Sequence, residues 1–282
     1  SQAREAGRWL MRGQLLASYE YGSQYLDTAR QAYALRPGDV FIQEVLSDAL
    51  TAAGNEQDAD GNTTQAYASF RDAFTYDPSN AAALAGAIYA ALADSNLLLA
   101  EQTLALAGPE EREVLQVLIY SGVLALWRRD YEAARGYFEK ARGRRQEAPL
   151  MWVGLGIVAL HDRDTRPAQA DFRRALETAT SGLDVLYNIV DMCRFHGFSS
   201  EAREYAPDLV AAATAAIAAD PARPALYEYR ALGYRALAED RNAERDEAAA
   251  RGLTGWWEGA QQSASSQAVP EVTLPPVNVG AR

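Results

Sequence analysis

The sequence predicts an all-α solenoid of about seven stacked helical hairpins, followed by an extended C-terminal tail. Hydrophobic and small residues recur with a period of 34 residues along most of the 282-residue chain, and a fixed period of this length is typical of proteins built from stacked hairpins. Small residues also stand where a buried helix usually carries large ones, as in MWVGLGIVALHDRDTRPAQADFRRALETA, residues 151–179. Such residues let helices approach closely, which indicates hairpins that stack on one another.

The hairpin repeats follow one another in a nearly constant register. Their first residues are expected near positions 6, 40, 81, 115, 149, 183 and 226. Residues 55–61 lengthen the turn of the second repeat, and residues 199–219 form an overlong second helix in the sixth, with Pro207 inside it. The seventh repeat lacks the usual small and aromatic residues of a second helix, which suits a capping hairpin. The solenoid is therefore expected to cover residues 1–259 and the extended tail residues 260–282.

The fifth repeat, residues 149–182, shows the repeated pattern most completely. Its marker positions are Trp152, Leu155 and Gly156 on the first helix and Ala168, Phe172 and Ala175 on the second. Arg-Pro at 36–37 and Asp-Pro at 77–78 and 220–221 end second helices, because proline cannot continue a helix. This pattern resembles the tetratricopeptide repeat (TPR) over roughly residues 6–252. The resemblance implies a bacterial multi-repeat protein folded as a right-handed superhelix, with the first helices lining an inner groove.

Composition and charge argue against several classes of function. The formal net charge of −11 argues against a nucleic-acid binder, which needs a basic face for phosphate. No run of about 18 uncharged apolar residues exists, so no membrane span is expected. The sequence has no nucleophile elbow, no phosphate-binding glycine loop and no paired metal-binding histidines. We therefore expect no enzyme, no cofactor and no metal site, while catalysis supplied by a partner or a fused domain stays an open alternative.

Three polar motifs each allow a functional and a structural interpretation. Residues 56–62, EQDADGN, resemble the first half of a calcium-binding loop, but Tyr67 stands where such a loop needs a carboxylate, which favours a solvated turn. Cys193 and His196 lie on one helical face, yet only one further histidine exists, which favours a buried core cysteine. The arginines near the turns of the two central repeats either bind an anion or keep the surface soluble. They are Arg128, Arg129, Arg142, Arg144, Arg145, Arg163 and Arg166.

The resemblance also indicates which side chains face the inner groove, at the second, fifth, ninth, twelfth and thirteenth positions of each repeat. In the first two repeats these side chains are mostly polar, namely Gln14, Ser18, Glu44, Asp48 and Thr51. In the later repeats they form a predicted partner-binding groove of Tyr89, Leu92, Ile119, Val123, Leu126, Trp127, Val153, Ile157, Leu160, Tyr187, Phe195, Tyr227 and Tyr234. A large exposed apolar surface usually marks an interaction site. The alternative is that the curvature of the superhelix buries these side chains against one another.

The tail carries hydrophobic residues but few helix formers. Val272, Leu274, Val277 and Val279 are spaced so that an extended segment presents them to a groove. We expect residues 268–279 to dock either along their own superhelix or in the groove of a neighbouring copy. Docking between copies would be head-to-tail, which builds rings or open filaments.

These observations predict a non-enzymatic scaffold that binds a protein or peptide segment in an apolar groove, with other copies of the chain as a second kind of partner. The alternative is a structural subunit of a bacterial envelope or surface assembly, such as pilus, secretion or exopolysaccharide machinery. Lys140 is the only lysine beside many arginines, which indicates a GC-rich bacterial genome. The chain begins at Ser1 without a methionine, so we expect a trimmed product, located in the periplasm or cell envelope rather than the cytoplasm.

Overall fold

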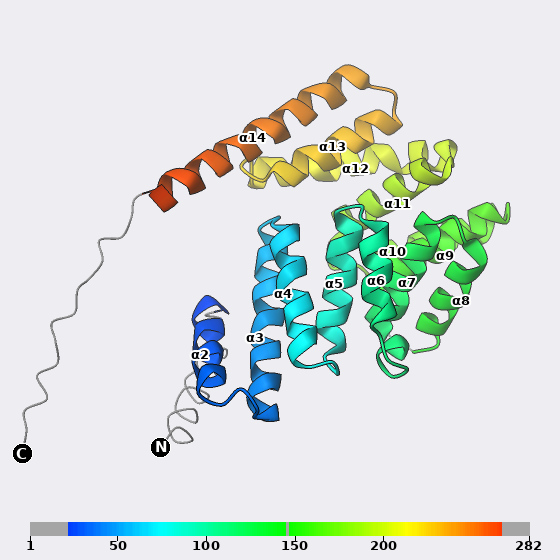
Figure 1. The fold of residues 1–282 in the computed structure, drawn as a ribbon. Coiled ribbons are helices and arrows are strands. Elements are labelled where there is room, and N and C mark those ends of the chain that lie inside the picture. Colours follow the sequence, from blue (N-terminus) through cyan, green and yellow to red (C-terminus); the bar gives the residue numbers. More distant parts are fainter. Residues whose placement is uncertain (1–21, 145–146, 267–282) are drawn as a thin grey trace, which may run out of the picture. The chain divides into compact units, whose positions relative to one another are not determined.

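The computed structural model describes residues 22–144 and 147–266, and all regular structure in these ranges is helical (Figure 1). The predicted all-α class is therefore confirmed. The chain divides into two compact units, an N-terminal unit that ends at Thr180 and a C-terminal unit that begins at Ser181. Among the described helices, none is both long enough and apolar enough to span a membrane.

The N-terminal unit consists of paired helices. Its elements are α2 (Gly22–Leu35), α3 (Val40–Ala59), α4 (Thr63–Tyr76), α5 (Ala81–Ala93), α6 (Leu97–Ala105), the 3-10 turn η1 (Glu111–Glu113), α7 (Leu115–Trp127), α8 (Tyr131–Arg142), α9 (Pro149–His161) and α10 (Thr165–Thr178). The first helices of successive hairpins, α3, α5, α7 and α9, each contact the next one, and each packs on the second helix of its own hairpin. The first helices thus form a continuous layer within this unit.

In its described residues, 181–266, the C-terminal unit contains four helices, α11 (Gly182–His196), α12 (Ser199–Ala219), α13 (Pro224–Ala236) and α14 (Asp240–Ser266). Each helix packs on the next, and α11 also contacts α13. Helix α12 continues through Pro207, as the sequence predicts for the overlong helix. Helix α14 includes residues 260–266, which the sequence analysis places in the extended tail, so these residues are helical.

Side-chain caps mark the starts of several helices. The Oδ1 atom of Asn80 accepts a hydrogen bond from the Ala83 amide at 2.9 Å at the start of α5. Asn96 does the same for the Leu99 amide at 3.0 Å at the start of α6. Each cap satisfies an amide that has no partner within its helix, and this stabilises the helix by about 1 kcal/mol.

The turn after each first helix has the same backbone form in three successive hairpins. Ser95, Arg129 and Arg163 follow α5, α7 and α9 with φ angles of 55°, 60° and 64°. These three residues stand 34 positions apart, so the period in the sequence corresponds to a repeated turn in the structure. The left-handed conformation disfavours residues other than glycine, so each turn carries a small amount of backbone strain.

The packing of phenylalanine rings explains the glycines of the repeats, including Gly154 and Gly156 in residues 151–179. The buried ring of Phe138 on α8 lies between Gly122 of its own hairpin and Gly154 of the next, and the ring of Phe172 lies against Gly156. A Cβ atom added at any of these glycines would lie within 3.0 Å of a ring atom, which is closer than real Cβ atoms approach. Glycine at these positions therefore leaves room for the ring that joins the hairpins.

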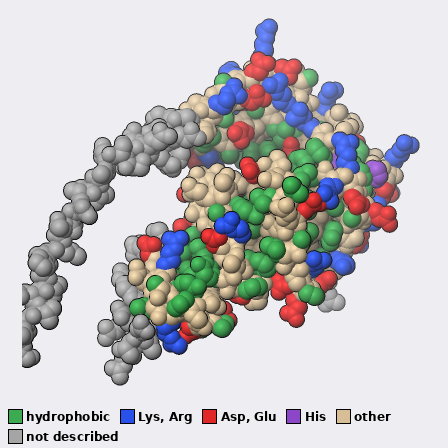
Figure 2. Space-filling model, viewed as in Figure 1, with side chains coloured by type: hydrophobic (Ala, Val, Ile, Leu, Met, Phe, Trp, Pro, Cys, Tyr) green, Lys and Arg blue, Asp and Glu red, His purple; other side chains and the backbone are tan. Residues whose placement is uncertain are grey.

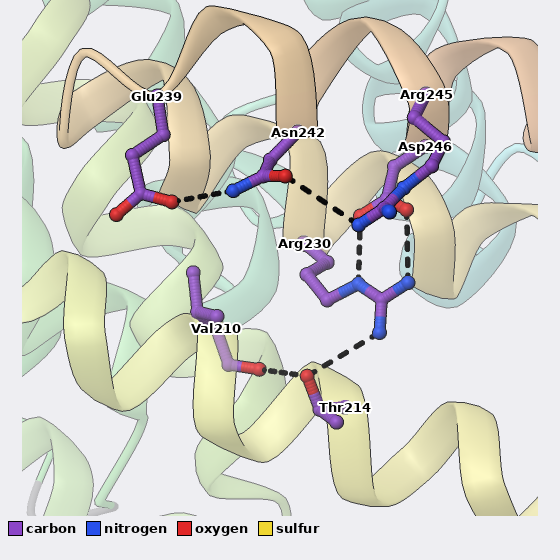
Figure 3. A network of polar contacts seen from close by, with 7 residues as sticks. All are labelled: Val210, Thr214, Arg230, Glu239, Asn242, Arg245 and Asp246. Carbon is purple, nitrogen blue, oxygen red and sulfur yellow. Dashed lines mark hydrogen bonds and ion pairs between the residues drawn. The ribbon is translucent and has the colours of Figure 1, made fainter.

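An ion pair joins the helices of the C-terminal unit (Figure 3). Arg230 on α13 donates from Nε to one carboxylate oxygen of Asp246 on α14 at 2.6 Å and from a terminal nitrogen to the other oxygen at 2.8 Å. Its second terminal nitrogen lies 3.4 Å from the Thr214 hydroxyl on α12. Asp246 is only 1% exposed, and Arg230 replaces the contacts with water that its carboxylate loses on burial. The network links three helices and leaves Arg230 engaged within the unit.

Candidate partner-binding surface

Most of the predicted groove residues in the N-terminal unit are buried. The buried side chains, each at most 8% exposed, are Leu92, Ile119, Val123, Leu126, Val153, Ile157 and Leu160. Trp127 is half-buried, whereas Tyr89 is 39% exposed. The burial of the aliphatic side chains is what the alternative of a self-filled groove predicts. A role for them in partner binding stays a prediction.

The predicted groove residues of the C-terminal unit are aromatic and more accessible. Phe195 is 36% exposed, and Tyr187, Tyr227 and Tyr234 are half-buried. The ring of Tyr187 stacks on Tyr229 with 4.2 Å between ring centroids. The start of α11, the end of α12 and the start of α13 enclose a small cleft of about 230 Å³. Its walls combine apolar residues with the charged Asp184, Asp220 and Arg223.

A larger cleft of about 580 Å³ lies in the N-terminal unit between the first turns of α7 and α9. The residues that line it are mainly apolar, and they are Leu115, Gln116, Ile119, Tyr120, Glu147, Ala148, Pro149 and Leu150. Leu115, Tyr120 and Leu150 are half-buried and Gln116 is exposed, so the cleft opens to solvent. Gln116 and Glu147 are the polar side chains among its mainly apolar walls.

Pro149 and the hydrogen bonds of Glu147 fix the start of α9, which forms one wall of this cleft. Pro149 begins α9, where its fixed φ angle suits the first helical turn. Glu147 accepts hydrogen bonds from Trp152 Nε1 at 2.8 Å and from the Arg174 guanidinium at 2.7 Å. The hydrogen bonds from Arg174 and Trp152 lower the pKa of Glu147, so its carboxylate stays charged at neutral pH. The segment before α9 is thereby fastened to α9 and α10.

Two tyrosines extend the cleft towards the preceding first helix. Tyr120 on α7 and Tyr89 on α5 lie with their ring centroids 5.6 Å apart. Burial raises the pKa of Tyr120 to about 12, with smaller contributions from Tyr89 and Asp58. The Tyr120 hydroxyl therefore remains protonated at neutral pH. The pair presents an aromatic surface that continues from the cleft to α5.

Carboxylates gather on α3 and at the end of α4. The pKa of Asp48 is raised, first by its partial burial and then by the neighbouring charges of Asp77 and Glu44. In the described ranges no lysine or arginine forms an ion pair with any of these three carboxylates. Within the part of the chain that the structure describes, this group, which we call the α3 carboxylates (Glu44, Asp48 and Asp77), therefore has no cationic ion-pair partner.

Three of the arginines near the turns form ion pairs. Arg128 pairs with Glu101, and Arg142 pairs with Glu139 at 2.5 Å. Arg144 pairs with Glu113. Arg145 lies outside the described residues. The paired side chains favour a solubilising and hairpin-joining role over an anion-binding patch.

The remaining polar motifs have structural roles in the described residues. Residues 56–59 continue helix α3, and Gly61 forms the turn after it with a φ of 79°, so the alternating acids do not form a calcium loop. Cys193 is buried, and burial raises the pKa of its thiol, which makes it a core residue with little thiolate. The predicted docking residues of the tail, Val272, Leu274, Val277 and Val279, lie outside the described residues.

Large hydrophobic side chains also reach the surface elsewhere in the N-terminal unit. Val40, Phe41, Leu98 and Leu106 are between 52% and 65% exposed. Figure 2 shows such side chains scattered among charged ones on the face in view. Val40 and Phe41 begin the first helix α3, whereas Leu98 lies on the second helix α6. Single exposed hydrophobic residues are common on soluble proteins, so Leu98 and Leu106 need no functional explanation.

Solved structures resemble this chain along most of its length. A tetratricopeptide repeat protein from Parabacteroides merdae matches 89% of this chain and 93% of its own, with a TM-score of 0.58 and 15% sequence identity. The chain has the tetratricopeptide-repeat fold. No protein-family model matches the sequence, and no curated protein matches it at a significant level.

Two further tetratricopeptide-like structures superpose less well, with lower TM-scores. PilF of Pseudomonas aeruginosa is 20% identical over 80% of this chain and 98% of its own, with a TM-score of 0.46. A thermophilic TPR protein in Thermus thermophilus is 17% identical over 68% of this chain and 98% of its own, with a TM-score of 0.49. With TM-scores below 0.5, neither supports an inference about this chain.

Tyr120, which forms an aromatic wall of the cleft, was not predicted from the sequence, and its position in the repeat explains why. Gly86 and Gly154 stand at the sixth position of their repeats and face phenylalanine rings of the preceding hairpins. The same position of the fourth repeat is Tyr120. The preceding hairpin carries Leu104 where its neighbours carry phenylalanine, so position six no longer has to be glycine. A tyrosine in place of a repeated glycine is the signal that could have found this residue.

Proposed function

We propose that this chain is a non-enzymatic scaffold that holds an extended segment of a partner protein on the first-helix layer of its N-terminal unit. The observation that carries the proposal is the apolar cleft of about 580 Å³ between α7 and α9. Its half-buried leucines and tyrosine offer a side chain of the partner a place to lose contact with water, which is the main source of binding energy at such sites.

The surroundings of the cleft support binding of a segment longer than one residue. The layer of first helices continues from α9 through α7 and α5 to α3. Tyr120 and Tyr89 lie next to each other on this layer and give flat aromatic surface beyond the cleft. Aromatic residues supply contact area at small entropic cost, so they commonly anchor bound segments.

The alternative function, a structural subunit of a bacterial envelope or surface assembly, stays a prediction. The same holds for the periplasm or cell envelope as its location. None of the described contacts favours this alternative over a scaffold that binds a partner segment.

Selection from a random library of twelve-residue peptides displayed on phage tests the proposal. The immobilised full chain is compared with Gln116→Trp, which fills the cleft from an exposed position, and with Leu150→Glu, which puts a charge on its wall. Leu98→Glu is the matched control, because Leu98 is exposed on the second helix α6. The control adds a similar charge to the same unit away from the cleft.

We expect the wild type and Leu98→Glu to enrich the same peptides. Gln116→Trp and Leu150→Glu should weaken binding of those peptides by about tenfold or more, which corresponds to about 1.4 kcal/mol or more. Circular dichroism of each variant verifies that it remains folded. Equal enrichment by all four proteins, or no enrichment by the wild type, would contradict the proposed function.

A further inference from the structure

We infer that the bound segment has a cationic half, which lies against the α3 carboxylates, and an apolar half, which enters the cleft between α7 and α9. The inference rests on the proposed function, since it concerns the chemistry of the segment that occupies the same surface. It commits to a partner that carries lysine or arginine a fixed distance from hydrophobic residues.

The two halves of this surface belong to one layer of helices. Glu44 and Asp48 stand at the fifth and ninth positions of their repeat on α3, and Tyr89 stands at the ninth position of its repeat on α5. Since α3, α5, α7 and α9 contact one another in this order, a segment can cross them without leaving the unit. Packed helices lie about 8–10 Å apart, so the crossing from α3 to α9 spans roughly 24–30 Å. An extended chain covers this distance with about eight residues.

The charge at the α3 end favours a cation. Two described basic side chains on neighbouring elements are already paired elsewhere: Arg36 lies 3.0 Å from Asp39, and Arg71 lies 2.6 Å from Asp72. Glu44 and Asp48 are exposed and Asp77 is half-buried, so a lysine or arginine of a partner can reach them. Partial burial raises the pKa of Asp48 most, and the charges of Asp77 and Glu44 raise it further. A cation placed among the three carboxylates would relieve this repulsion.

The opposite end favours apolar groups. Five of the eight residues that line the cleft are aliphatic or proline, and Tyr120 adds an aromatic wall. Glu147 is the one charged residue among them, and Arg174 and Trp152 already satisfy its carboxylate. A second charged group entering here would lose its hydration without gaining a new partner.

The absence of basic residues distinguishes residues 268–279 of the tail from the partner segment that we infer. Residues 268–279 contain valine, leucine and proline but neither lysine nor arginine. This tail therefore suits the apolar half of the surface and not the carboxylate half. A strongly anionic segment or a nucleic acid would be repelled by the α3 carboxylates.

The peptides selected above provide the test. We expect the enriched twelve-residue sequences to carry lysine or arginine towards one end and hydrophobic residues towards the other. An enriched peptide is then synthesised with a fluorescent label and titrated by anisotropy against the full chain. Glu44→Lys/Asp48→Lys should weaken its binding about tenfold or more. The conservative Glu44→Gln/Asp48→Asn variant should weaken it less, and the affinity of the wild type should fall as salt is raised.

The matched control is Glu110→Lys/Glu132→Lys, which makes the same change of charge at two exposed positions outside the α3 carboxylates. Enriched sequences without a cationic bias, or equal effects of the two double variants, would overturn the inference. If Gln116→Trp still weakens binding about tenfold or more in that case, the proposed function stands and only the chemistry of the segment is wrong. If Gln116→Trp has no effect on the enriched peptides, the proposed function fails and the inference fails with it.

Discussion

Single glycines set how closely the hairpins of the N-terminal unit can pack. At Gly156 an added Cβ atom would come within 3.0 Å of the Phe172 ring, so Gly156→Ala forces the ring or its helix to move. Overpacking of a buried contact costs about 1–3 kcal/mol. We predict a loss of this size in the free energy of unfolding, measured by urea denaturation followed by circular dichroism.

Gly136 on α8 is the matched control for this substitution. Nothing lies within 4 Å of a Cβ atom added there, and the position is exposed. Alanine is favoured over glycine in an exposed helix by roughly 0.8–1 kcal/mol, so Gly136→Ala should raise the free energy of unfolding. If Gly156→Ala is stabilising as well, close packing against Phe172 does not explain the glycine.

At the scale of helices, one side chain ties the start of α5 to α3. Asn80 caps α5 and also donates from Nδ2 to the Ser47 hydroxyl at 2.8 Å and to the Thr51 hydroxyl at 3.1 Å. Ser47 is fully buried, so losing this partner is costly. We predict that Asn80→Ala lowers the free energy of unfolding by about 2–3 kcal/mol, the sum of a lost cap and lost buried hydrogen bonds.

Asn96 allows the effect of the cap to be measured apart from that of the further hydrogen bonds. It caps α6 through the Leu99 amide, and it is exposed. Asn96→Ala should cost only about 1 kcal/mol, the usual value of a cap. Urea denaturation of both variants compares them directly. Equal losses would mean that the hydrogen bonds from Asn80 to α3 add nothing to stability.

The helices themselves were predictable from the sequence, because each hairpin repeats the same local chemistry. The 34-residue period predicts hairpin starts near 81, 115 and 149, and these are the first residues of α5, α7 and α9. The end of α14 was harder to predict. Residues 260–266 are rich in glutamine, serine and alanine, which are compatible with either a helix or a polar tail.

The candidate site was less predictable than the helices, for a physical reason. The position of a residue in its repeat fixes the direction in which its side chain leaves the helix, but it does not fix what covers that side chain. Val153 and Ile157 therefore stand at groove positions and are nevertheless fully buried. Tyr120 was not predicted because it stands where neighbouring repeats carry glycine. The meaning of this difference becomes clear only when the side chains that pack against that position are known.

At the scale of the whole molecule, a deletion tests the predicted docking of the tail. Deleting residues 267–282 leaves α14 intact and removes the proposed docking residues. If the tail docks on its own chain, the deletion should leave the mass measured by light scattering unchanged and should increase binding of an apolar dye. A fall in mass to one subunit would instead indicate docking between copies. No change in mass or in dye binding would show that the tail covers no apolar surface.

The central claim is that a partner segment binds the first-helix layer of the N-terminal unit. A photo-crosslinking residue placed at Tyr89, on the first helix α5, tests it against the same residue placed at Leu98, on the second helix α6. Both positions are exposed and belong to the same unit, so they differ in the face that they report. We predict that an enriched peptide crosslinks from position 89 and not from position 98. Crosslinking from position 98 alone, or with equal yield from both, would contradict the account.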